Sequence, residues 1–83
     1  MRLKITRASG DTIVSITPII EYAFEKYAGQ GISKQFRESE KQSDLYWLAH
    51  NALMRQEVIP PFGDDFLATL VEVEILGDDN PKA

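Results

Sequence analysis

The segment from Ser39 to Gln56 most constrains how this chain folds, because it has the longest helical pattern in the sequence. Its apolar residues recur at spacings of three and four, along one stripe of an α-helix. These residues are Leu45, Leu48, Ala49, Ala52 and Leu53. Trp47, His50 and Met54 have the same spacings on a neighbouring face. A helix that is apolar on more than one side needs cover on both, so we expect the other segments to supply that cover.

Two segments near the N-terminus predict a β-hairpin. Arg2–Ile5 alternates polar and apolar residues, and the β-branched segment Thr12–Ile16 alternates in the same way. Between them Ala8–Asp11 has turn chemistry, with Gly10 able to take a positive φ. Because a two-stranded hairpin is marginal in water on its own, we expect its apolar face to lie on helices.

The hairpin is followed by two predicted helical segments. Thr17 suits the cap of a helix as a side-chain acceptor, and Pro18 suits the first helical position, where no N–H is needed. Gly29 and Gly31 end this helix, and Ile32–Arg37 has the form of a short helical turn anchored by Phe36. The expected inward stripe of the first helix is Ile19, Ile20, Ala23, Phe24 and Tyr27.

The central helix is bounded by a capping signal and by prolines. Ser39 with Gln42 three residues later has the form of a capping box, which predicts the start of the helix. Pro60 and Pro61 cannot continue it. A last helix is expected from Gly63 and Asp64, with Phe66, Leu67, Leu70 and Val71 inward.

The C-terminal end carries two overlapping periods. Val71–Ile75 alternates like a strand, whereas Leu67, Leu70 and Val71 continue a helical period. We expect a helix to about Glu72 and then an extended end that adds a short strand beside the hairpin. The predicted fold class is α+β, an N-terminal β-hairpin packed on about three α-helices. It forms a single domain over residues 1–76, with residues 77–83 as a flexible acidic tail.

Composition excludes several kinds of chemistry. The chain has no cysteine, which removes disulfides, thiolate catalysis and cysteine zinc sites. His50 has no orienting acid on its helical face, and neither Asp64-Asp65 nor Asp78-Asp79 has the spacing of a calcium loop. No apolar run approaches the roughly 18 residues of a membrane span. We therefore expect no catalytic residue, cofactor or metal, no membrane contact and a cytoplasmic location.

Charge is unevenly placed along the chain. Up to Gln56 there are eight basic and six acidic residues, and from Glu57 onward one basic and seven acidic residues, so +2 and −6 give the net −4. Because nucleic-acid affinity rests mainly on cations at phosphates, this distribution argues against nucleic acid as a partner. A hairpin followed by helices also allows a DNA-binding winged helix, which this charge pattern disfavours.

Three motifs resemble the small tail assembly chaperones of long-tailed bacteriophages, which are encoded before the tape measure protein. They are AFEKY in the first helix, DLYWLAHNAL in the central helix and FGDDFLATLVEVEIL near the end. The family pattern has a second aromatic residue in "WLAW", where this chain has His50. The likeness covers nearly the whole chain, and none of the motifs is catalytic.

The resemblance implies a non-enzymatic protein of the host cell cytoplasm that binds the tape measure protein and helps recruit the tail tube protein. An exposed aromatic and methionine patch is a typical protein-contact anchor. The candidate partner-binding residues are Tyr46, Trp47, His50 and Met54. Self-association stays open, and so does an alternative function as a small acidic phage protein that inhibits a host enzyme, supported by the −6 segment.

The family is also commonly made in a longer form by programmed ribosomal frameshifting. Asn80-Pro81-Lys82 can be encoded by codons that contain the heptamer C-CCA-AAR, of the type on which a ribosome slips back by one base. We therefore hypothesise a frameshifted longer form, which the gene sequence tests.

Overall fold

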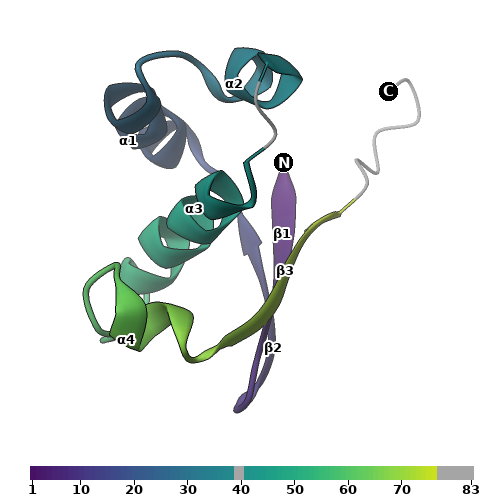
Figure 1. Cartoon of the computed structure of the whole chain (residues 1–83), viewed down its shortest axis with the longest axis vertical. Helices are drawn as coiled ribbons and strands as arrows, with labels where there is room; N and C mark the ends of the chain where they lie inside the picture. The colour runs from purple at the N-terminus through teal and green to yellow at the C-terminus, as the bar shows by residue number, and fades with distance from the viewer. Residues whose placement is uncertain (39–40, 77–83) are drawn as a thin grey trace.

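The computed structural model describes residues 1–38 and 41–76. In chain order the elements are β1 (Arg2–Arg7), β2 (Gly10–Ser15), α1 (Pro18–Ala28), α2 (Ile32–Glu38), α3 (Gln42–Met54), α4 (Asp64–Leu67) and β3 (Leu70–Leu76). The strands form one antiparallel sheet in the order β2-β1-β3 (Figure 1). The predicted α+β class, the hairpin and the added C-terminal strand are confirmed. The tail predicted at residues 77–83 lies outside the described residues.

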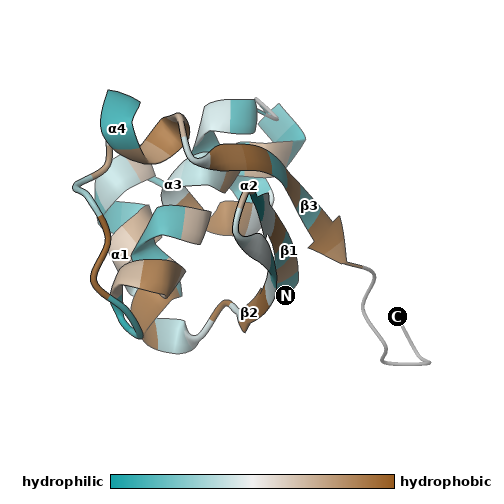
Figure 2. Cartoon of the chain, turned by 90° about the horizontal axis from the view of Figure 1, so that it is seen from below, coloured by the Kyte–Doolittle hydropathy of each residue, from teal (hydrophilic) through white to brown (hydrophobic). Residues whose placement is uncertain are grey.

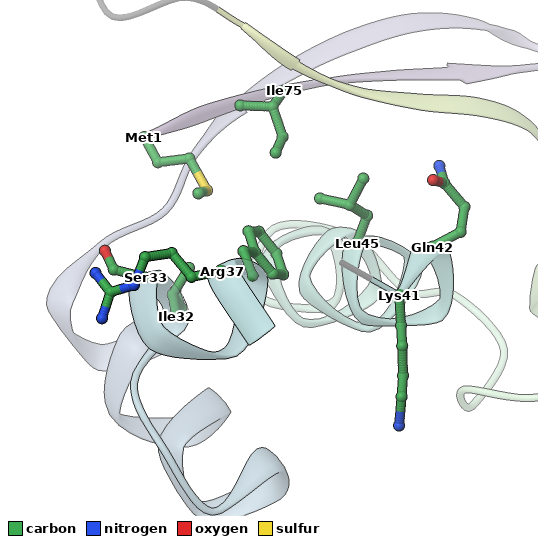
Figure 3. A pocket seen from close by; sticks show the side chains of 9 residues that line it. Met1, Ile32, Ser33, Arg37, Lys41, Gln42, Leu45 and Ile75 are labelled. Atoms are coloured by element: carbon green, nitrogen blue, oxygen red, sulfur yellow. The ribbon is translucent and has the colours of Figure 1, made fainter. Parts of the chain in front are cut away.

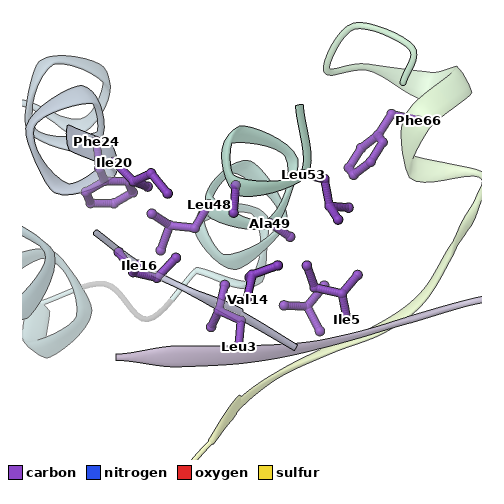
Figure 4. Packing of buried hydrophobic residues seen from close by; sticks show 12 residues of the cluster. Leu3, Ile5, Val14, Ile16, Ile20, Phe24, Leu48, Ala49, Leu53 and Phe66 are labelled. Carbon is purple, nitrogen blue, oxygen red and sulfur yellow. The ribbon is translucent and has the colours of Figure 1, made fainter. Parts of the chain in front are cut away.

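One face of the sheet supplies the floor of the core. Leu3 pairs with Val14 on one side, and Ile5 pairs with Val73 on the other. Because paired residues of antiparallel strands lie on the same face, these side chains gather under the helices. All four are buried, and Figure 4 shows Leu3, Ile5 and Val14 beneath the helices. The ribbon coloured by hydropathy shows the helices grouped beside the strands (Figure 2).

Helix α3 is covered by the rest of the chain along its centre. Every residue from Leu48 to Leu53 is buried, which is more than one stripe of a helix accounts for. Phe24 of α1 and Phe66 of α4 pack in the same core as Leu48 and Leu53, on either side of α3 (Figure 4). The expectation that a helix with several apolar faces needs cover from other segments is confirmed, and between Leu48 and Leu53 this chain itself provides the cover.

The last helix is much shorter than predicted. It ends at Leu67, where the Thr69 hydroxyl donates a hydrogen bond to the Phe66 carbonyl at 2.7 Å. From Leu70 onward the chain pairs with β1 as strand β3. This pairing gives hydrogen-bond partners to backbone N–H and C=O groups of β1 that would otherwise lie at the edge of the sheet. Since Arg7 pairs with Leu70 and Thr6 with Glu72, Val71 is the extra residue of a bulge and is 68% exposed. The prediction of an inward Val71 was wrong.

The predicted start of α1 at Thr17 and Pro18 is confirmed, whereas the predicted capping interactions of α1 and α3 differ from the structure. Thr17 is the cap residue of α1, but its side chain makes no capping hydrogen bond. Helix α3 begins at Gln42 with Lys41 as its cap, so Gln42 is the first helical residue and not the third residue of a capping box. The acidic group in that first turn is Asp44 instead. Ser39 lies outside the described residues.

The inward stripe of α1 is narrower than predicted. Ile20 and Phe24, one turn apart, are buried, whereas Ile19 is 57% exposed and Tyr27 is 48% exposed. Only the ridge formed by Ile20 and Phe24 enters the core, so the residues flanking this ridge remain at the surface.

Candidate functional site

Trp47 links α3 to α1 through ring contacts. Its ring stacks on Tyr27, with centroids 4.6 Å apart and planes at 15°, and meets Phe24 edge-on at 5.8 Å. Trp47 is partly buried by these contacts, while Tyr27 is about half exposed. The accessible aromatic surface at this place is therefore the Tyr27–Trp47 stack and not an isolated tryptophan.

His50, three residues after Trp47 on α3, is covered by residues that follow the helix. Its Nε2 lies 2.8 Å from the Pro60 carbonyl oxygen. Because a carbonyl only accepts, Nε2 carries the proton and donates. The imidazole also meets the rings of Phe66 at 4.7 Å and Phe62 at 5.7 Å, both edge-on. These contacts leave His50 9% exposed, so it holds the segment after α3 against the helix.

The four predicted partner-binding residues therefore do not share one open face. Tyr46 is partly buried against the core, and Met54 at the end of α3 is 47% exposed. Trp47 and Met54 are seven residues apart and lie on the same side of the helix. We define the Trp47 surface as Tyr27, Trp47 and Met54.

The structure also contains a groove that the sequence pattern did not predict. Its cavity volume is about 520 Å³, and it lies between α2, the start of α3 and the end of β3 (Figure 3). Five apolar residues from different parts of the chain form its lining. They are Met1, Ile32, Phe36, Leu45 and Ile75. We call this site the Phe36 groove.

Leu45 is less buried than its place in the apolar stripe of α3 predicts. It belongs to the apolar stripe of α3, but it is only partly buried because it lies beyond the part of the helix that α1 and α4 cover. Ile75, on the same face of the sheet as Leu3, is 44% exposed for the same reason. The only sequence signal for the groove was Phe36, a single large apolar residue in a short helix.

A buried polar network fixes the groove wall. The Gln35 amide nitrogen donates to an Asp44 carboxylate oxygen at 2.9 Å, and the Gln30 amide nitrogen donates to the Gln35 side-chain oxygen. Gln35 is 8% exposed and Asp44 is 3% exposed. Since buried polar groups are costly to leave unpaired, this network holds α2 against the start of α3.

The rim of the groove is basic. Arg37 and Lys41 line it and are exposed, and Ser33 and Gln42 complete the lining. These two side chains are positive, although the net charge of the whole chain is −4. An apolar floor with a cationic rim suits binding of an amphipathic acidic segment.

The described ranges contain no cluster of three or more residues of the metal-ligating types His, Cys, Asp and Glu. Among the helices of these ranges, none is both long and apolar enough to cross a bilayer. Comparisons with protein-family models, with curated proteins and with solved structures gave no match.

Proposed function

We propose that this chain is a tail assembly chaperone of a long-tailed bacteriophage. In the host cell cytoplasm it binds the tape measure protein, keeps it soluble and supports recruitment of the tail tube protein. The observation that carries the proposal is the order of three motifs, AFEKY, DLYWLAHNAL and FGDDFLATLVEVEIL, along nearly the whole chain. The proposed activity is binding, without catalysis or a cofactor.

Most residues that carry the resemblance belong to the core. They include Phe24, Leu48, Ala49, Leu53 and Phe66, all of which are at most 1% exposed. His50, at the position where the family pattern has an aromatic residue, lies among the rings of Phe62 and Phe66. The motif residues therefore mainly build the core of this chain, and the binding surface consists of residues outside that core.

Exposed apolar side chains support the holdase role. The described residues leave ten large hydrophobic side chains exposed, and α1 alone contributes Ile19, Tyr22 and Tyr27. A holdase needs such area to offer a client, and charge to keep the complex in solution. The Trp47 surface combines a stacked aromatic pair with Met54, a flexible side chain that adapts to varied partners.

Co-expression with the tape measure protein of the same phage tests the proposal. We expect the tape measure protein to co-purify with tagged wild-type chain and Met54→Gln to reduce the yield. Ile13→Thr is the matched control, since Ile13 is 56% exposed on β2 and its neighbour Val14 faces the helices. Absence of the tape measure protein from the wild-type eluate contradicts the proposed function.

A further inference from the structure

We propose that the Phe36 groove binds an amphipathic α-helix of the client, apolar on one stripe and flanked by aspartate or glutamate. This inference rests on the proposed function, because it names the client segment that the chaperone recognises. It places the main contact in the groove at the start of α3 and leaves the Trp47 surface as a second contact.

The size and lining of the groove fit protein side chains. The groove has a volume of about 520 Å³, which is room for several side chains of a partner. Leu45 of α3 and Ile75 of β3 project into it (Figure 3), and Phe36 of α2 also lines it. These side chains offer apolar area that a partner can remove from water.

The kind of segment follows from what lines the groove. Its walls are side chains of α2, α3 and β3 (Figure 3). Although β3 is an edge strand of the sheet, Ile75 pairs with Leu3 and enters the groove from the face of the sheet that the helices cover, so an incoming segment meets side chains there. An α-helix satisfies its own backbone groups and presents side chains at i, i+3, i+4 and i+7, which is the helix-in-groove mode of recognition.

Charge at the rim selects the occupant. Arg37 and Lys41 are exposed and line the groove, with the Lys41 side chain extended away from Leu45 and Ile75 (Figure 3). Both side chains are long, so carboxylates that flank the apolar stripe of a client helix come within reach of these cations. A symmetric contact between two copies through this groove would bring Arg37 and Lys41 of one copy close to those of the other. Like charges then oppose that pairing, which favours an acidic client over a second copy.

Binding of overlapping peptides from the tape measure protein to the ¹⁵N-labelled chain tests the inference. We expect the tightest peptides to carry an apolar stripe with acidic flanks and to shift the NMR signals of Phe36, Leu45 and Ile75. Arg37→Glu with Lys41→Glu should weaken binding about tenfold or more. Lys34→Glu is the control for a single charge reversal on α2, because Lys34 lines a different cavity, and it is compared with Arg37→Glu alone as well as with the double variant. It should change affinity less than about twofold.

A second pair of variants separates the apolar floor from the charged rim. Ile75→Thr should weaken peptide binding, whereas Val71→Thr, on the same strand but outside the groove, should leave it unchanged. Threonine keeps the β-branched shape that strands favour, so both variants should remain folded. The dispersion of the NMR spectrum checks that they do.

Several results overturn the groove assignment. Equal losses with Lys34→Glu and the double variant show a general charge effect, and shifts confined to the Trp47 surface place the client there. Dimerisation abolished by Ile75→Thr makes a second copy the occupant. Peptide binding that appears only after deletion of residues 77–83 makes this segment the occupant.

The two proposals fail in different ways. If the tape measure protein binds wild-type chain and the Arg37/Lys41 double variant equally, the proposed function stands and the groove assignment falls. If it does not bind wild-type chain, the proposed function falls. A designed helical peptide of leucine and glutamate then tests the groove directly, with a leucine and lysine peptide as control. Equal binding of these two peptides overturns the groove assignment.

Discussion

Truncation of two leucines on α3 tests whether this helix has a closed centre and an open end. Leu48 is fully buried between the sheet and α1. Its replacement by alanine loses transfer free energy and leaves a cavity, which costs about 3 kcal/mol. Leu45 lines the open Phe36 groove, where water already reaches the side chain. No closed cavity forms there, so Leu45→Ala should cost only about 1 kcal/mol.

These losses are large enough to separate in a small domain. For 83 residues, a stability of about 0.05–0.15 kcal/mol per residue gives about 4–12 kcal/mol in total. With a urea slope of about 1 kcal/mol per molar, Leu48→Ala should lower the unfolding midpoint by about 3 M and Leu45→Ala by about 1 M. Unfolding is monitored by circular dichroism. Equal shifts of the midpoint for the two variants would refute the reasoning and place Leu45 in a closed core.

Three further predictions concern single positions. His50→Phe keeps the ring contacts with Phe62 and Phe66 but removes the donor to the Pro60 carbonyl, so the segment after α3 should become more sensitive to limited proteolysis; unchanged cleavage would contradict this role. Gly29 ends α1 at φ +82, so Gly29→Ala should cost about 1 kcal/mol in thermal denaturation, whereas Gly31→Ala, where φ is not positive, should cost clearly less. If a longer form exists, the gene reads C-CCA-AAR through codons 80–82, and synonymous codons at these positions would remove the frameshift hypothesis.

Local signals explain which parts of the fold could be predicted from the sequence. The β-branched alternation of β2, Pro18 at the start of α1 and Gly29 at its end each act within a few residues. Residues 67–71 were misread because helical and strand periods overlap there. The choice between them depends on pairing with β1, more than sixty positions earlier in the chain.

The candidate site was harder to predict for the same physical reason. Trp47, His50 and Met54 share a helical spacing, but Tyr27 covers part of Trp47 and Pro60 accepts the hydrogen bond of His50. The Phe36 groove combines residues from four separate stretches of the chain. The spacing of residues within one segment carries no information on which distant segments lie beside it. The groove could therefore be found only in the folded structure.

Solubility of the tape measure protein tests the central claim most directly. The tape measure protein of the same phage is expressed alone, with this chain, and with the Arg37→Glu and Lys41→Glu double variant, and its soluble fraction is measured after centrifugation. We predict that it is mostly soluble with the wild-type chain and largely insoluble when expressed alone. An unchanged soluble fraction with and without the wild-type chain would contradict the chaperone function.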